Sequence, residues 1–378
     1  MPTIHAYNVH DLVRVRSERR LPELEFFRTN ALGGRPDIEV AVKANPARTP
    51  SLEALHYREL FGRWGFPIAL ERTSEHTVAR VSPLIAASPH VLYTNVVEPL
   101  LRWLLVRKGY ALMHGACLAT AGSAVFVTAR TDTGKTTTIL NTLRGSNGGY
   151  GFLSDDMTIF CPDGRVLAYP KPLTISRHTV QAIGGAPLTA VERIKLVPQS
   201  RLHSKEGRGV GMELYRRGFP AATLSAVVQR LVPPPKYMVD RLVPGARYAE
   251  SAWLERVVVI ERGPDGRDEL PADALADLLV ANAEDAYGFP PYPVLERELC
   301  RWGGEDLLER ERAIVSATLG GKPAVRVRSS SFAWHEYLLS LAADAGGSGV
   351  GDASGRRLRD RVRSPGQRVV NEAAALDG

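Results

Sequence analysis

Ala-Arg-Thr-Asp-Thr-Gly-Lys-Thr-Thr, residues 129–137, stands between two runs of different character. The apolar, β-branched run Ser123 to Thr128 precedes it, and the helix-compatible run Thr138 to Arg144 follows it. A strand, a tight glycine-containing loop, Lys-Thr and a helix are the layout of a phosphate-binding loop. Such a loop works because a helix N-terminus offers unpaired amide groups and the positive end of its dipole to a phosphate. We therefore predict that the phosphate ligands are Thr131, Asp132, Thr133, Gly134, Lys135, Thr136 and Thr137.

Within this loop three residues have distinct predicted tasks. Lys135 would reach the β- and γ-phosphates, the Thr136 hydroxyl would bind Mg²⁺, and Gly134 would let the backbone approach the phosphates closely. The usual pattern is Gly-x-x-x-x-Gly-Lys-Ser/Thr, and Ala129 stands at its first glycine. Alanine fits there only if φ is not strongly positive. The competing interpretation is a strand-to-helix turn that contains Gly-Lys-Thr by chance.

Two neighbouring segments add candidate catalytic residues. Gly151 to Asp156 is a short apolar run that ends in two adjacent carboxylates, Asp155 and Asp156. At the carboxyl end of a strand, such carboxylates can hold Mg²⁺ or accept a proton from an attacking hydroxyl. Before the loop, His114 leads into another apolar run. Taken alone, the aspartates could cap a turn and His114 could be a core histidine. The three features together in one stretch indicate an active site.

This combination resembles the core of the HPr kinase/phosphatase family and its HPr-kinase-like relatives, whose nucleotide-binding fold is shared with phosphoenolpyruvate carboxykinase. The resemblance covers roughly residues 97–176, including Glu98-Pro99-Leu100-Leu101 before the histidine and Tyr169-Pro170-Lys171-Pro172-Leu173 after the aspartates. It extends more weakly to Leu254 to Gly263. Ala129 and Asp132 depart from the family pattern. The arginine-bearing signature that HPr kinases carry downstream is absent, so the resemblance does not extend to HPr as substrate or to the phosphatase half-reaction.

The resemblance implies an α/β fold: a P-loop kinase core of the HPr kinase/phosphoenolpyruvate carboxykinase type with a small N-terminal α+β domain. It also implies a magnesium- and ATP-binding transferase, a kinase that moves the γ-phosphoryl group to a hydroxyl of a protein, a peptide or a small molecule. The catalytic residues would be His114, Lys135 and Asp155, with Asp155 as the base. Thr136 and Asp156 would bind Mg²⁺. The alternatives are a catalytically silent nucleotide-binding regulator and, less favoured, a carboxykinase-like lyase.

Composition limits the partners. The chain has 378 residues, is 44% hydrophobic and 24% charged, and has a net charge of +7. We interpret this modest positive charge as solvated surface plus a phosphate site rather than a nucleic-acid interface, because aromatic residues are not interleaved with basic ones. The sequence offers no signal peptide and no apolar run long enough to span a membrane. The three cysteines, Cys117, Cys161 and Cys300, are widely spaced. This spacing predicts a protein of the reducing cytoplasm rather than one with disulfides or a zinc site.

We divide the chain into an N-terminal α+β domain (1–95), a nucleotide-binding domain with C-terminal helical additions (96–340) and a disordered tail (341–378). The N-terminal domain could position a substrate or support a homo-oligomer. Predicted strands are 38–43, 67–70, 90–93, 111–120, 123–128, 254–262 and 324–328, and predicted helices are 52–63, 98–108, 270–286 and 305–318. A second cation near the γ-phosphate could come from a basic residue between 201 and 247. The acceptor itself is not identified by the sequence.

Overall fold

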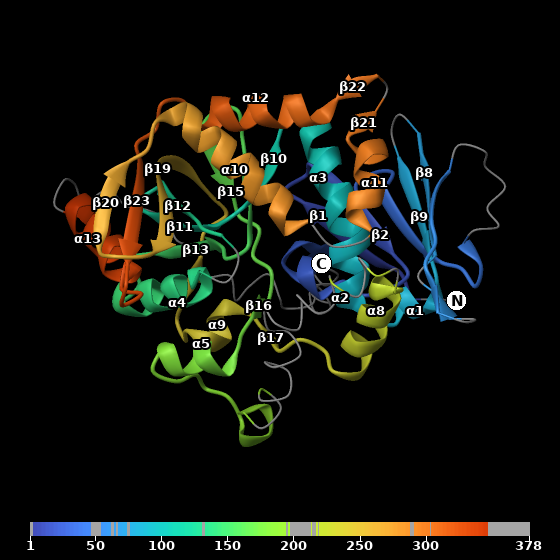
Figure 1. The fold of residues 1–378 in the computed structure, drawn as a ribbon, viewed down its shortest axis with the longest axis horizontal. Coiled ribbons are helices and arrows are strands. Elements are labelled where there is room, and N and C mark those ends of the chain that lie inside the picture. Colours follow the sequence, from blue (N-terminus) through green and yellow to red (C-terminus); the bar gives the residue numbers. More distant parts are fainter. Residues whose placement is uncertain are drawn as a thin grey trace, which may run out of the picture.

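The computed structural model describes residues 3–46, 54–61, 64–65, 67–73, 76–130, 133–193, 196, 213, 217, 219–287, 291–302 and 304–346. In these residues the fold is mixed α/β, as predicted (Figure 1). Thr131 and Asp132 of the predicted phosphate loop lie outside the described residues. So does most of the basic segment between 201 and 218.

The first sheet is built only from strands that precede Pro83. Its seven strands lie in the order β3-β1-β2-β4-β9-β8-β5. Their bounds are β1 His5–Val9, β2 Val13–Ser17, β3 Arg28–Thr29, β4 Ile38–Val42, β5 Leu55–Tyr57, β8 Ile68–Arg72 and β9 Thr77–Val81, with a separate pair β6 Leu60–Phe61 and β7 Trp64–Gly65. The predicted strands at 38–43 and 67–70 are confirmed. The helix predicted over 52–63 is wrong: its described part contains β5 and β6, because pairing of β5 with β8 overrides the local helical pattern.

A continuous helical segment connects the two sheets (Figure 1). It follows α1 (Pro83–Ala86) and consists of α2 (Pro89–Leu92), a π-helix (Tyr93–Val97) and α3 (Glu98–Arg107). The predicted helix at 98–108 is confirmed, whereas the strand predicted at 90–93 is wrong. Pro89 occupies the first turn of α2, a position that favours helix, and a short apolar run suits a buried helix as well as a strand.

The second sheet carries the predicted phosphate loop and both aspartates in the connections between its elements. Its main path is β10-β14-β15-β19-β12-β11-β13-β18, and β23 pairs with both β19 and β20. The bounds are β10 Ala111–His114, β11 Ala116–Thr120, β12 Ser123–Thr128, β13 Gly151–Ser154, β14 Met157–Phe160, β15 Arg165–Leu167, β18 Arg247–Tyr248, β19 Ser251–Arg262, β20 Gly266–Glu269 and β23 Ala324–Ser329. Strands β12, β19 and β23 are parallel, so their carboxyl ends meet at one edge of the sheet, where open α/β sheets bind ligands.

Gly115 divides the strand predicted at 111–120 into β10 and β11. A Cβ atom on this glycine would lie 2.1 Å from the Phe126 ring, so only glycine fits. Its amide donates a hydrogen bond to the carbonyl oxygen of Asp156 at 2.9 Å. The break therefore brings the ends of β10 and β13 together.

The remaining helices and short strands lie around both sheets (Figure 1). They are α4 Lys135–Gly145, α5 Arg177–Ala182, α8 Ala221–Leu231, α9 Val239–Leu242, α10 Ala272–Ala286, α11 Tyr292–Leu299, α12 Leu307–Leu319, α13 Trp334–Gly346, η1 Pro22–Phe27, β16 Leu173–Thr174, β17 Lys236–Tyr237, β21 Arg301–Trp302 and β22 Glu305–Asp306. Helices α10 and α12 agree with prediction. Helix α13 continues into the segment predicted as a tail, and residues 347–378 lie outside the described part.

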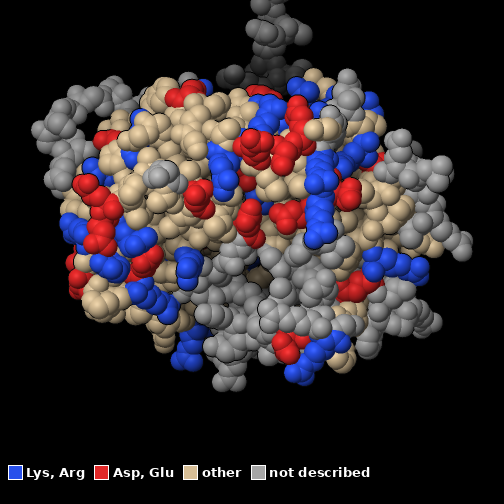
Figure 2. All heavy atoms as spheres, turned by 45° about the horizontal axis from the view of Figure 1, so that its top comes forward, with Lys and Arg blue, Asp and Glu red and all other residues tan. Residues whose placement is uncertain are grey.

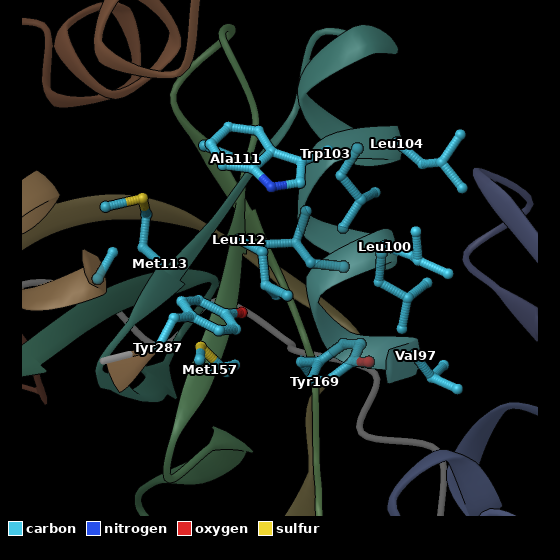
Figure 3. Close-up of a cluster of buried hydrophobic side chains, with 14 of the residues drawn as sticks. Val97, Leu100, Trp103, Leu104, Ala111, Leu112, Met113, Met157, Tyr169 and Tyr287 are labelled. Atoms are coloured by element: carbon cyan, nitrogen blue, oxygen red, sulfur yellow. The ribbon is translucent and has the colours of Figure 1, made fainter. Parts of the chain in front are cut away.

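One apolar core includes side chains from both sheets and from α3. Figure 3 shows its middle, where Trp103 and Leu100 of α3 lie beside Leu112 of β10 and Tyr169. A smaller cluster joins α4 to the sheet and to α13. The same interior holds a charged pair, Arg102 and Glu311, both fully buried.

A second buried polar cluster joins the N-terminal unit to the rest of the fold. Glu23 of η1 is 1% exposed and contacts Nδ1 of His90 at 2.9 Å and Nζ of Lys236 at 2.7 Å. Burial would raise the pKa of Glu23, but Lys236 and His90 outweigh it and lower the pKa to about 2. Burial and Lys236 lower the pKa of His90 to about 4.

The surface carries both signs of charge. On the face drawn in Figure 2, acidic and basic side chains are interspersed rather than gathered by sign. No described helix is long and apolar enough to cross a membrane. The three cysteines are free and buried.

Candidate active site

The phosphate loop begins at Ala129, directly after β12. Ala129 is not among the described non-glycine residues with positive φ, so the backbone there accepts alanine. Thr133 closes the loop: its amide and its Oγ1 both donate to the carbonyl oxygen of Arg130, at 3.2 and 2.7 Å. Gly134 follows with φ of 125°, a conformation that favours glycine. The two glycine positions of the usual pattern therefore have different backbone requirements here, and only the second needs glycine.

Helix α4 starts at Lys135 and directs its N-terminus at the loop. Gly134 is the N-cap residue and has no side chain with which to cap the helix. The first amide groups, on Lys135, Thr136 and Thr137, have no partner within the helix because an α-helix leaves them unpaired. With the positive end of the dipole, they can bind an anion.

His114, a predicted catalytic residue, lies against Lys135. Its Nδ1 is 3.2 Å from the carbonyl oxygen of Asn282, which can only accept, so Nδ1 carries the proton. Nε2 then accepts from Nζ of Lys135 at 3.0 Å. Burial and the nearby Lys135 charge lower the pKa of His114, which keeps the ring neutral. Burial likewise lowers the pKa of Lys135.

Asp155 contacts the loop through Thr136. The Thr136 hydroxyl donates to Oδ2 of Asp155 at 2.8 Å, whereas the buried Oδ1 has no hydrogen-bond partner. Burial raises the pKa of Asp155 to about 6, although Lys135 and Thr136 oppose the shift. An unpaired carboxylate oxygen beside a threonine hydroxyl is a donor set that fits Mg²⁺, which commonly takes one or two protein oxygens and leaves the rest to phosphate and water. Among the described residues no three His, Cys, Asp or Glu side chains gather as a complete metal site.

Asp156 points to different partners. Its Oδ1 lies 3.4 Å from Nε2 of His114, and its Oδ2 forms an ion pair with Lys171. Its side chain is 47% exposed, whereas Asp155 is buried. Burial would raise the pKa of Asp156, but the charges of Lys171 and Lys135 hold it well below its usual range. The two adjacent carboxylates therefore have different environments: one faces Thr136 and the other faces solvent, His114 and Lys171.

Lys171 and Glu98 belong to the site, although no role was predicted for either. Nζ of Lys171 lies 3.2 and 3.1 Å from the two carboxylate oxygens of Glu98, and 5.6 Å from the centre of the Tyr93 ring. Both residues are buried; burial would lower the pKa of Lys171, but the carboxylates of Asp156 and Glu98 hold it above its usual value. The signal was present, because both stand in the segments that carried the family resemblance.

A basic residue between 201 and 247 was expected to supply a second cation near the γ-phosphate. Among the described residues, none in this range contacts Lys135, Asp155 or Asp156 through its side chain. Of the basic residues between 201 and 247, Lys236 pairs with Glu23, Arg241 with Glu192 and Arg217 with Glu213, while Arg247 bonds the carbonyl of Gly148. Residues 201–212 and 214–216 lie outside the described part. Lys171 lies in the connection between β15 and β16. Of the described lysines and arginines, it is the one that forms an ion pair with Asp156, near Lys135.

The structure thus brings together Lys135, Thr136, Asp155, Asp156 and His114, five residues that the sequence singled out. They come from β10, α4 and the turn after β13. Comparison with known proteins adds no family to this geometry: no protein-family model matches the chain, and no curated protein matches it significantly.

Proposed function

We propose that this protein is an ATP- and magnesium-dependent kinase that transfers the γ-phosphoryl group to a hydroxyl. The observation that carries the proposal is the contact of Thr136 Oγ1 with Asp155 Oδ2 at 2.8 Å, one residue after Lys135 at the start of α4. A chance Gly-Lys-Thr turn has no reason to meet a buried carboxylate from another strand. In P-loop enzymes a threonine and an aspartate in this relation hold the metal of a bound nucleotide.

Phosphate binding would rest on α4. The amides of Lys135, Thr136 and Thr137, with the ammonium group of Lys135, supply donors for the β- and γ-phosphates. Because Lys135 is buried beside a neutral histidine, its charge is only partly compensated, and a polyphosphate would supply the missing negative charge. Mg²⁺, held by Thr136 and Asp155, would neutralise charge on the transferring group.

The contacts favour an exchange of the two predicted aspartate roles. Asp155, rather than Asp156, adjoins the Thr136 hydroxyl and so suits the metal. Asp156 is partly exposed and held by its ion pair with Lys171, so we propose it as the residue that accepts the proton of the acceptor hydroxyl. It is a weak base. In a loose phosphoryl-transfer transition state the attacking oxygen has formed little bond, so orientation of the hydroxyl matters more than basicity.

Lys171 and Glu98 would act as positioning residues. Lys171 bonds Asp156 on one side and Glu98 on the other, which fixes the Asp156 carboxylate in its orientation. His114, neutral and hydrogen-bonded to Lys135, would hold the ammonium group between phosphate and acceptor. We propose the cytoplasm as the location, and a protein, a peptide or a small molecule as the acceptor.

A transfer assay tests the proposal. Cell extract is incubated with the protein and γ-labelled ATP, and phosphoester formation is compared among wild type, Lys135→Ala and Lys322→Ala. Lys322 precedes β23, at the sheet edge opposite the site, and serves as a matched lysine control. We expect labelled acceptor with wild type and with Lys322→Ala only. Binding of Mg-ATP without transfer to any acceptor would favour the nucleotide-binding regulator instead.

A further inference from the structure

The carboxyl edge of the second sheet extends beyond the phosphate loop in both directions. On one side of β12 lie β11 and then β13, which leads to Asp155 and Asp156. On the other side lie β19 and then β23, both parallel to β12. Arg262 is the last residue of β19, and Phe332 follows shortly after the end of β23. The loop therefore has the two aspartates on one side and Arg262 with Phe332 on the other.

Phe332 is an exposed aromatic residue in an unfavourable backbone conformation. Its φ is 63°, in the left-handed region that residues other than glycine seldom occupy, and 47% of its surface is accessible. The conformation costs free energy in any residue other than glycine, so it persists only where the surrounding structure holds it. Strained, exposed residues that persist in a fold occur preferentially where a ligand is bound.

Direct contacts tie Phe332 to the phosphate loop. The guanidinium carbon of Arg262 lies 5.1 Å from the centre of the Phe332 ring, and Nε of the same arginine donates to the carbonyl oxygen of Thr133 at 3.2 Å. Phe332 also packs edge-to-face on Trp334, with ring centres 5.5 Å apart. Trp334 is buried, donates to the carbonyl of Val327 at 3.0 Å, and lies 3.2 Å from the position that a Cβ on Gly134 would take. The ring is thus held at a fixed place beside the loop.

The direction of a bound nucleoside triphosphate follows from this layout. Its γ-phosphate must lie toward Asp155 and Asp156, where transfer would occur. Its nucleoside must then leave the loop on the opposite side, toward Arg262 and Phe332. Bases stack on aromatic rings and on guanidinium planes, and a two-ring base offers the larger stacking area.

We propose that Phe332 and Arg262 form a platform on which the purine base of the nucleotide stacks. The inference rests on the proposed nucleotide-binding function and adds to it the nucleoside subsite and the class of base. It also explains why the chain keeps an exposed phenylalanine in a left-handed conformation next to the loop.

Calorimetric titration with two probes tests the platform. Mg-ATP carries both the phosphates and the base, whereas Mg-tripolyphosphate carries phosphates alone. Phe332→Ala is expected to raise the Kd of Mg-ATP about tenfold and to change that of tripolyphosphate less than about twofold. Phe332→Trp should keep the wild-type Kd for Mg-ATP, and Mg-CTP should bind more weakly than Mg-ATP to wild type.

Two further variants control for folding. Phe332→Gly removes the ring and relieves the positive φ, so it should melt no lower than wild type and yet lose the same tenfold in Mg-ATP affinity. Trp253→Ala is the matched control: this tryptophan is 55% exposed under Arg165, at 5.8 Å, near the start of β19 at the opposite sheet edge. It should bind Mg-ATP as wild type does.

The outcomes separate the platform from the proposed function. Equal losses for Mg-ATP and tripolyphosphate in Phe332→Ala, or no loss for either, would overturn the platform while leaving the kinase proposal intact. If wild type binds Mg-tripolyphosphate as tightly as Mg-ATP, the platform is overturned and the kinase proposal stands. Wild type that binds neither probe would overturn both.

Discussion

Arg102 and Glu311, between α3 and α12, can be compared with the charged side chains around Lys135. Nε and one terminal nitrogen of Arg102 donate to the two oxygens of Glu311 at 2.8 and 2.6 Å, and the other terminal nitrogen bonds the Tyr292 hydroxyl at 3.0 Å. Each charged group is matched, and both residues are fully buried. Around Lys135, by contrast, one oxygen of Asp155 is unpaired, and Lys135 itself bonds a neutral histidine.

This difference separates two uses of buried charge. A buried ion pair that is fully hydrogen-bonded needs nothing more, and its loss destabilises the fold. A buried group with unpaired atoms and perturbed pKa values is completed by a ligand, and its loss affects binding or chemistry. The four predictions below test whether the two groups respond differently.

The largest expected effect is on the rate of transfer. Asp156→Asn should lower turnover by about 10²- to 10⁴-fold with little change in the Kd of Mg-ATP, because the acceptor proton moves only during the reaction. Asp155→Asn should weaken nucleotide binding with Mg²⁺ more than without it. Calorimetry with and without Mg²⁺, combined with single-turnover kinetics, measures both. Asp277→Asn, in a surface pair with Arg312, is the control. Weakened Mg-ATP binding in Asp156→Asn alone would restore the role assignment expected from sequence.

Breaking the matched pair should affect stability instead. Arg102→Met would leave the Glu311 carboxylate buried without a partner, and we expect a loss of roughly 3–5 kcal/mol in the free energy of unfolding. Urea denaturation measures it. The double variant Arg102→Met/Glu311→Leu should recover most of the loss, since no charge then stays buried. Stabilisation by Mg-ATP should be the same in all three proteins; its disappearance in Arg102→Met would mean that the pair serves the site.

Lys135→Met should show the reverse behaviour. Because burial lowers the pKa of Lys135, the fold disfavours its charge, and removal should leave the unliganded protein at least as stable as wild type. Stabilisation by Mg-ATP at a hundredfold excess over Kd, about 2.7 kcal/mol, should vanish. Lys171→Met is the contrasting variant, since it leaves Glu98 buried and unpaired and should unfold more readily. An unchanged Mg-ATP shift in Lys135→Met would contradict the phosphate role.

The smallest expected effect concerns Glu23, His90 and Lys236, a buried cluster that includes a titrating ring and in which Oε2 of Glu23 has no hydrogen-bond partner. Unfolded histidine takes up a proton near pH 6.5, whereas His90 resists it until about pH 4, so stability should fall as pH drops through this window. Protonation of Glu23 should extend the loss of stability from about pH 4.5 toward pH 2. In His90→Gln the free energy of unfolding should change less steeply between pH 6.5 and 4, by up to about 1.4 kcal/mol per pH unit. Urea denaturation across pH measures it, and identical slopes would show that His90 does not contribute.

The sequence predicted those parts of the fold that depend on local pattern. Strand β12, the loop and α4 form a continuous signal, and the apolar run of β19 is a second one. The short apolar run at His90 was misjudged because a buried helix and a buried strand share that composition. Helix α13 was not predicted, and its residues from 341 onward lie where the polar composition predicted a disordered tail.

The site was predictable as far as its motif extends. His114, Lys135, Thr136, Asp155 and Asp156 were found because each lies in a recognisable segment. No role for Lys171 and Glu98 follows from the sequence, since their ion pair joins residues 73 positions apart and no local pattern encodes that pairing. The division of labour between Asp155 and Asp156 depends on which way each carboxylate points, and that is set by the turn after β13.

The π-helix at Tyr93–Val97 makes the site sensitive to chain length rather than to side-chain chemistry. Its wide turn, in which the amide of Glu98 bonds the carbonyl of Tyr93, accommodates one residue more than an α-helical turn would. Each residue of an α-helix rotates the chain by about 100°, so deleting one residue here would restore a plain helix and turn Glu98 away from Lys171 by about that angle. Substitutions along this turn should therefore be tolerated far better than a single deletion. The same rotation would turn the buried side chains of α3 out of their places in the core, so a lineage that lost one residue at this point would lose packing as well as the orientation of Asp156.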